Sequence, residues 1–253
     1  MKVQLIRNAT ININVNNKNI LVDPMLGSKG VLGPFPWTDD TRANPLTELP
    51  FTEAELNALI HKTDAVLLTH LHPDHWDPTA QTLLPKDMLI YCQNEDIEPI
   101  KTLGFHNVIG ITDSTIFEGI HIHRTVAIHG EGEIGHLMGN ASGFVLSHNQ
   151  EIVYLMGDTI WCKEVKQAID HYQPTGIVIN GGAAKFAIGE HVTMNSTDIK
   201  TLLDYYPIKQ VAIVHLEAIS PLQENRNMLK AYFEEHNLSS RVIIPNDADI
   251  FTV

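Results

Sequence analysis

Three histidines and an aspartate lie within six consecutive positions of the segment LLTHLHPDHWDP: His70, His72, Asp74 and His75. Imidazoles grouped this closely repel one another once more than one of them is protonated. A divalent metal ion removes this repulsion, because neutral imidazoles and carboxylates are good ligands for such ions. Four candidates in so short a segment favour two ions side by side. The alternative is a polar helix cap with incidental histidines.

The conformation of this segment decides which side chains meet. If HLHPDH is extended, alternate side chains project to one side, so His70, His72 and Asp74 converge. His75 then points to the other side, near the start of a helix that DPTA predicts.

Two metal ions need further ligands, and the position of His70 indicates where to look. His70 directly follows the apolar run AVLLT, which is typical of a buried strand. Three other residues of types that can bind metal follow apolar runs in the same way: His129 after TVAI, Asp158 after IVYLMG and His215 after VAIV. Alone, each could be a strand-end histidine, a helix cap or a core histidine. Their shared context predicts one metal centre.

The first third of the chain predicts the elements that lead to this motif. Strands with a tight turn at Asn16–Asn17 are expected before Asp23, because Asn tolerates left-handed geometry. The segment 24–50 is rich in Pro and Gly and carries Phe35 and Trp37. Its length is typical of a functional loop, so we expect a lid or pocket wall, with a simple surface loop as the alternative. Thr52 and Glu55 form a capping box that predicts a helix over 53–61.

The remaining segments alternate between strand and helix signals. Apolar residues at helical spacing predict helices over 165–172 and 199–206. Ser220 as cap, Pro221 in the first turn and Gln223 predict the start of another helix. GIVIN and QVAIVHL are short buried strands between these helices. The mixture predicts a single layered α/β domain over residues 1–253.

Composition limits the function classes. The 253 residues are 43% apolar and 19% charged, with a formal net charge of −13. Such an acidic chain disfavours nucleic acids and anionic membranes as partners, although a metal centre could attract an anionic small-molecule substrate. Cys92 and Cys162 are expected to be free thiols. No signal-peptide core or membrane-spanning stretch is visible, so a cytoplasmic location is expected. A homo-oligomer is compatible with the sequence.

The quoted motifs together resemble one known superfamily. THLHPDHWD, AIHGEGEIG, MGDT and IVHLEA, in this order, are similar to the motifs of the metallo-β-lactamase superfamily. The resemblance covers essentially the whole chain. It implies a four-layer αββα sandwich with mixed sheets, helices on both outer faces and two metal ions at one edge. It also implies the ligands: His70, His72 and His129 for the first metal, Asp74, His75 and His215 for the second, and Asp158 bridging both.

Within the superfamily, the chain resembles ascorbate-6-phosphate lactonases, uncharacterised metal-dependent hydrolases and N-acyl-phosphatidylethanolamine phospholipase D enzymes. We expect no C-terminal helical domain like that of glyoxalase II. Only 57 positions (215 − 158) separate Asp158 from His215, which argues against the large domain that RNA-processing nucleases insert between their motifs. EHVTMNSTD, which contains His191, is similar to a segment that precedes a helix in this branch. His191 is therefore a candidate proton donor, with an ordinary loop histidine as the alternative.

The resemblance predicts a metal-dependent hydrolase. Two ions, zinc or manganese, would lower the pKa of a shared water toward roughly 7 and provide hydroxide for attack on an ester, lactone or phosphodiester. Asp74 would orient this nucleophile as well as bind metal, and His191 would protonate the leaving group. One alternative is an iron-dependent oxidoreductase on the same scaffold, since these ligands also suit iron. A non-catalytic metal-binding module is another.

Overall fold

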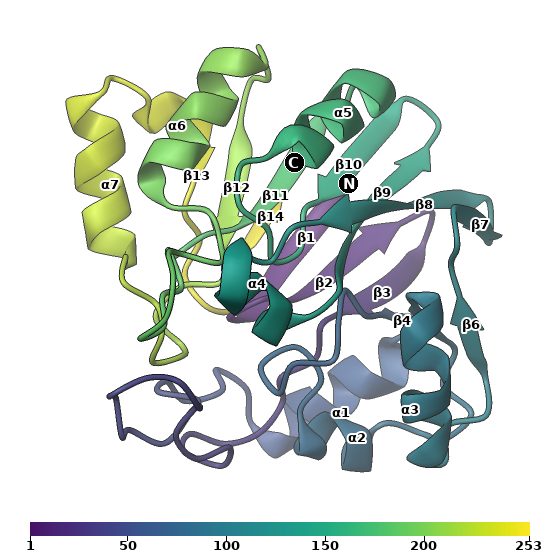
Figure 1. Ribbon diagram of the computed structural model, residues 1–253. Coiled ribbons are helices and arrows are strands. Elements are labelled where there is room, and N and C mark those ends of the chain that lie inside the picture. The colour runs from purple at the N-terminus through teal and green to yellow at the C-terminus, as the bar shows by residue number, and fades with distance from the viewer.

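Two seven-stranded sheets pack face to face in the computed structural model, which describes residues 1–253 (Figure 1). The first sheet has the order β14 (Ile250–Thr252), β1 (Lys2–Arg7), β2 (Thr10–Val15), β3 (Lys18–Val22), β4 (Ala65–Leu67), β5 (Ile90–Cys92) and β6 (Val108–Gly110). It is antiparallel from β14 to β3 and parallel from β3 to β6.

The second sheet is also mixed. Its order is β13 (Val242–Ile243), β12 (Val211–Val214), β11 (Gly176–Asn180), β10 (Glu151–Leu155), β9 (Ala141–His148), β8 (Ile120–Ala127) and β7 (Ser114–Phe117). Strands β10 to β13 are parallel and β7 to β10 antiparallel. A core of 22 buried residues from both sheets fills the space between them.

Helices cover the outer face of each sheet. On the first sheet lie α1 (Glu53–Lys62), α2 (Pro78–Leu83) and α3 (Ile97–Thr102), with the 3-10 turn η1 (Asn94–Asp96) before α3. On the second lie α5 (Lys163–Tyr172), α6 (Ser196–Tyr205) and α7 (Arg226–Glu235), followed by η2 (Ser239–Arg241). The short helix α4 (Gly132–Met138) follows β8 (Figure 1). The predicted four-layer αββα sandwich is confirmed. None of these helices has the length and apolar character to cross a membrane.

Local sequence signals explain several element boundaries. The capping box of Thr52 and Glu55 starts α1 as predicted. Asn16 and Asn17, at φ 48° and 60°, form the left-handed turn between β2 and β3. The predicted helix start at Ser220 is wrong, because the next helix, α7, begins only at Arg226 and is capped by Asn225.

Ser220 is hydrogen-bonded to Asn44 and does not cap a helix. Its N–H donates to Asn44 Oδ1 at 2.9 Å, and Asn44 Nδ2 donates to Ser220 Oγ at 3.2 Å. Both bonds join Ser220 to the loop 24–50. A long-range contact therefore replaces the local structure that the sequence predicts.

A buried arginine anchors both ends of the loop 24–50. The guanidinium of Arg7 is fully buried and donates to the carbonyls of Met25 and Gly27 at 2.9 and 2.7 Å and of Thr47 at 3.1 Å. At the tip of the loop, the carbonyl of Trp37 accepts a hydrogen bond from the backbone N–H of Ala187 at 2.7 Å. The loop is thereby fixed at its base and joined at its tip to the segment that follows β11.

Candidate metal centre

The seven predicted ligands come from four loops that meet at one edge of the sandwich. His70, His72, Asp74 and His75 follow β4, and the other three follow β8, β10 and β12: His129, Asp158 and His215. Side chains that follow neighbouring strand ends meet at the same sheet edge. The structure brings all seven together in three overlapping groups of possible ligand atoms.

The first group consists of three imidazoles. The possible ligand nitrogens of His70, His72 and His129 all lie within 4.8 Å of one another. His70 Nε2 is 2.9 Å from His72 Nδ1, and His129 Nε2 is 3.3 Å from the same atom. Burial lowers the pKa of His72 to about 4 and that of His70 well below its ordinary value. Neutral imidazoles that direct nitrogens at one another suit a shared cation.

The second group contains Asp74, His75 and His215. Asp74 Oδ2 lies 3.1 Å from His215 Nε2 and 3.4 Å from His75 Nε2. Burial alone would raise the pKa of Asp74, but His75 and His215 lower it well below its usual range. The carboxylate therefore stays ionised in a buried site, which is the form that binds metal.

The third group joins Asp158 to one histidine of each of the other groups, His70 and His75. Asp158 Oδ2 is 3.3 Å from His75 Nε2, 3.5 Å from His129 Nε2 and 3.7 Å from His215 Nε2. The other oxygen, Oδ1, accepts a hydrogen bond from Asn180 Nδ2 at 2.7 Å. This bond fixes the carboxylate and leaves one oxygen facing residues of both groups, as a bridging ligand requires.

Outer partners orient two of the histidines. His75 Nδ1 is 2.9 Å from Asp23 Oδ2, and His129 Nδ1 is 2.9 Å from the carbonyl oxygen of Val192. Each partner accepts the Nδ1 proton, so in the neutral ring the lone pair is on Nε2, which faces the site. His75 Nε2 is buried and has no hydrogen-bond partner. An unpaired buried nitrogen surrounded by carboxylates and imidazoles fits a metal ligand, so the residues present fit the implied metals.

The sequence rule that found the ligands could also have found Asp23. This residue follows the apolar run ILV at the end of β3. Besides His75, its carboxylate accepts hydrogen bonds from Thr69 N and Thr69 Oγ1 at 2.8 and 2.7 Å. Asn180 follows the same pattern at the end of β11. Neither residue belongs to the four motifs that resemble the superfamily, so these motifs do not reveal the two partners.

The HLHPDH segment differs from the extended conformation expected for it. The backbone N–H groups of His75 and Trp76 both donate to the carbonyl of His72 at 2.9 Å, which closes a tight turn. The turn brings the His75 ring to 4.1 Å from the His70 ring, between centroids. The expectation that His75 points to the other side was therefore wrong, and the turn explains how all four side chains reach one centre.

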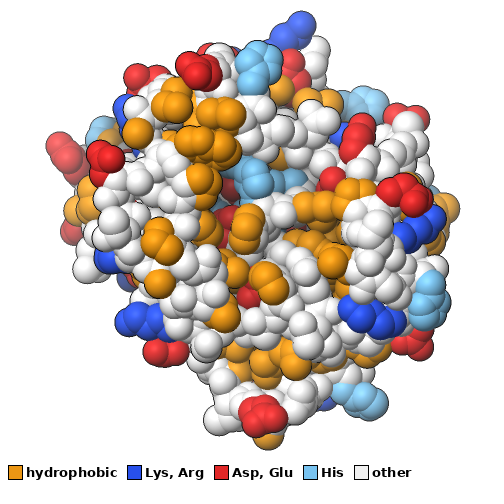
Figure 2. Space-filling model, turned by 60° about the horizontal axis from the view of Figure 1, so that its bottom comes forward, with side chains coloured by type: hydrophobic (Ala, Val, Ile, Leu, Met, Phe, Trp, Pro, Cys, Tyr) orange, Lys and Arg blue, Asp and Glu red, His pale blue; other side chains and the backbone are white.

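A cavity of about 360 Å³ opens over this centre. Figure 2 shows a histidine at the bottom of a hollow with apolar side chains on its rim. The polar residues on its surface are all predicted ligands: His72, Asp74, His129, Asp158 and His215. Its walls are apolar: Phe35, Pro36, Trp37, Pro73, Leu137, Met138, Ala184, Phe186, Val192, Ile219 and Pro221. No lysine or arginine lines it.

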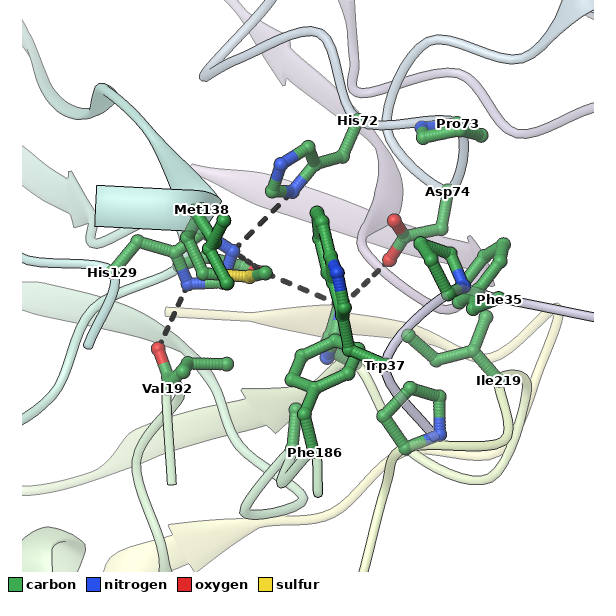
Figure 3. Close-up of a pocket in the computed structure, with 16 residues that line it drawn as sticks. Phe35, Trp37, His72, Pro73, Asp74, His129, Met138, Phe186, Val192 and Ile219 are labelled. Atoms are coloured by element: carbon green, nitrogen blue, oxygen red, sulfur yellow. Dashed lines mark hydrogen bonds and ion pairs between the residues drawn. The ribbon is translucent and has the colours of Figure 1, made fainter. Parts of the chain in front are cut away.

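The loop 24–50 supplies part of the cavity wall, as predicted. Phe35 and Trp37 line the cavity with Phe186; in Figure 3, Trp37 and Phe186 stand between His129 and Asp74, and Phe35 lies on the side of Asp74 and Ile219. Trp37 is 42% exposed and thus belongs to the rim and not to the core.

His191 is the one predicted site residue that the structure brings neither to the cluster of candidate ligands nor to the cavity. It is not among the lining residues. Its Nε2 lies 2.8 Å from Asp198 Oδ2 and 3.3 Å from Asn195 Nδ2, at the start of α6. A side chain held there does not reach a substrate in the cavity in this conformation. Its catalytic role stays a prediction.

Comparison with known proteins is consistent with this geometry. The family model described as Beta-lactamase superfamily domain matches residues 18–216. The UPF0173 protein YddR of Bacillus subtilis is 36% identical and is aligned over 100% of both chains. The crystal structure of an isothiocyanate hydrolase from Delia radicum gut bacteria is 33% identical, with a TM-score of 0.93 over 100% of this chain and 99% of the other. A possible metal-dependent hydrolase from Veillonella parvula is 29% identical, with a TM-score of 0.95 over the same shares.

Proposed function

The chain belongs to the metallo-β-lactamase superfamily and, within it, to the UPF0173 family of metal-dependent hydrolases; on this premise we propose that it hydrolyses a small, uncharged molecule that carries an apolar group. The observation that carries the proposal is the position of the metal-binding groups at the bottom of an apolar cavity without a lysine or arginine.

The proposed centre holds two divalent ions, with zinc and manganese both compatible with the ligands. The assignment follows the groups of ligand atoms: His70, His72 and His129 for one ion, Asp74, His75 and His215 for the other, and Asp158 shared. When bound, the ions would polarise the substrate and make water acidic enough to attack at neutral pH.

The residues of the chain would orient the nucleophile and the ligands and exclude water. Asp74 lines the cavity and is the carboxylate that would orient the attacking water as well as bind metal. Asp23 and the Val192 carbonyl keep His75 and His129 in the tautomer with a free Nε2. Phe35 and Trp37 would cover the apolar part of the substrate and limit access of bulk water.

The cavity walls favour some of the expected bond types over others. The part of the substrate that does not react would contact side chains such as Leu137, Met138 and Phe186. A charged group buried against them would lose its hydration without a partner. An ester or lactone with an apolar substituent is therefore favoured over a phosphodiester. For the same reason, the phosphate of an ascorbate-6-phosphate-like substrate has no cationic side chain to bind.

An isothiocyanate is a second candidate substrate, favoured by the similarity to the isothiocyanate hydrolase. An isothiocyanate R–N=C=S is neutral and presents an electrophilic carbon beside its R group. Addition of water across the C=N bond places oxygen on carbon and a proton on nitrogen. Cleavage of the C–N bond in the resulting thiocarbamic acid releases the amine and carbonyl sulfide.

A panel of substrates tests the proposal. Metal-reconstituted protein would be assayed with an apolar p-nitrophenyl ester, an alkyl lactone, benzyl isothiocyanate and bis-p-nitrophenyl phosphate, with Asp158→Ala as the control. We expect turnover of at least one neutral substrate that exceeds turnover of the phosphodiester and that disappears in the control. A preference for the phosphodiester would contradict the assignment of a neutral substrate. Turnover that requires oxygen would favour the iron-dependent oxidoreductase, and metal binding without turnover would favour the non-catalytic module.

A further inference from the structure

Asn8 lies directly behind the candidate centre, in the turn between β1 and β2. It is 1% exposed and has a φ of 57°. Asn is one of the few residues other than Gly that adopts this left-handed conformation readily. The local backbone therefore accounts for Asn or Gly at this position but does not require a side-chain amide.

The contacts of Asn8 join two of the proposed ligands of one metal ion. Its side-chain Nδ2 donates to Asp74 Oδ2 at 3.2 Å and to the Asp74 carbonyl at 3.3 Å. Its own carbonyl accepts a hydrogen bond from the backbone N–H of His215 at 2.9 Å. His215 also has a positive φ, 62°, a conformation that a histidine keeps only when its surroundings hold it. One residue thus positions both Asp74 and His215.

The side-chain oxygen of Asn8, Oδ1, shows which contact determines the orientation of the amide. Oδ1 is buried and has no hydrogen-bond partner. Turning the amide over would give no better result, because Oδ1 would then face the two oxygens of Asp74. An unpaired buried acceptor destabilises the fold, and such groups are concentrated where function requires them. The amide is therefore placed for its bonds to Asp74 and not for stability.

We propose that Asn8 is a positioning residue for the ion held by Asp74, His75 and His215. Its N–H fixes the direction of the Asp74 carboxylate, and its carbonyl fixes the backbone from which His215 projects. Because the amide is neutral, it does this without adding a charge to the centre. The inference rests on the proposed function only in requiring a second metal ion.

The variant Asn8→Gly tests this role, because glycine accepts the left-handed backbone while the amide is lost. Zinc would be titrated into chelator-treated protein against a chromophoric competing chelator, so that the two binding constants are resolved. The matched control is Asn17→Gly, which removes an exposed Asn at φ 60° from the next turn. Thermal melting of the apo-proteins would measure folding separately.

We expect the affinity for one zinc ion to fall by about 10–100-fold in Asn8→Gly, as for other partners of metal ligands. The other binding constant and both constants of Asn17→Gly should stay unchanged. Two unaltered constants in Asn8→Gly would overturn the proposal. So would an equal loss at both sites or a variant that does not fold, since Asn8 would then support the fold alone. Wild-type protein that binds only one ion would instead overturn the dinuclear centre.

Discussion

The orientation of His75 by Asp23 gives a prediction whose size can be worked out from the contacts. Asp23 Oδ2 accepts hydrogen bonds from His75 Nδ1 at 2.9 Å and Thr69 Oγ1 at 2.7 Å, while Oδ1 accepts from Thr69 N at 2.8 Å. In Asp23→Asn, the Thr69 N–H still requires the carbonyl oxygen at Oδ1. The new NH₂ group therefore faces His75 Nδ1, which has to become an acceptor.

This reversal places the His75 proton on Nε2, the atom directed at Asp74 and Asp158. A protonated Nε2 cannot bind metal, so binding must either rotate the ring or break the bond to position 23. Loss of such a partner costs roughly 10–100-fold in metal affinity, which corresponds to about 1.4–2.8 kcal/mol at 25 °C.

Competition titration with a chromophoric chelator measures this loss directly. The control is Asp64→Asn, which removes the same charge from a carboxylate that accepts a bond from Asn19 N at 2.8 Å, away from the candidate centre. We expect Asp64→Asn to bind both zinc ions like the wild type. Equal zinc affinities in Asp23→Asn and wild type would refute the tautomer argument, because the amide cannot accept the His75 proton.

Three further outcomes follow from the structure. Trp37→Ala should raise KM for an apolar ester by roughly tenfold, since an aromatic contact contributes about 1–2 kcal/mol, and should hardly change Tm. A large fall in Tm with an unchanged KM would show that the loop is structural. Burial raises the pKa of Asp96 to about 6, so the folded state binds this proton more tightly than the unfolded chain. The free energy of unfolding therefore falls as pH rises from about 4 to 6. Asp96→Asn should raise the free energy of unfolding by about 1 kcal/mol at pH 8, allowing for solvent screening, and leave it unchanged at pH 3.5. Urea unfolding of the apo-protein at both pH values measures this difference. His191→Gln should leave turnover close to wild type if the ring stays bound to Asp198, and a loss of roughly 10²–10⁴-fold would show that His191 is the predicted proton donor.

The residues of the candidate centre were accessible from sequence because four of them follow apolar strands and the other three lie within five positions of His70. His70, His129, Asp158 and His215 share that pattern, and strand ends of neighbouring strands meet at one edge whatever the details of the loops. The four-layer arrangement itself came from the resemblance of the motifs, since periodicity alone predicted only a layered α/β domain.

The contacts that the sequence did not reveal are those made across long separations. Asn8 and Asp74 are 66 positions apart, and Asn44 and Ser220 are 176 apart. The Ser220 signal was locally correct for a helix start, but its backbone bonds to Asn44 instead. For His191, the motif was similar to that of relatives, but Asp198 binds the ring away from the cavity. For Asn8 and Ser220 a distant partner determines the contact, whereas the partner of His191 is only seven positions away.

Elemental analysis of chelator-treated protein reconstituted with zinc or manganese tests the central claim most directly, when wild type and Asp158→Ala are compared. Asp158 Oδ2 lies between both groups of candidate ligands. We predict close to two equivalents of metal per chain in the wild type and clearly fewer in Asp158→Ala. A ceiling of one equivalent in the wild type, with binding unchanged in Asp158→Ala, would contradict a bridged two-metal centre.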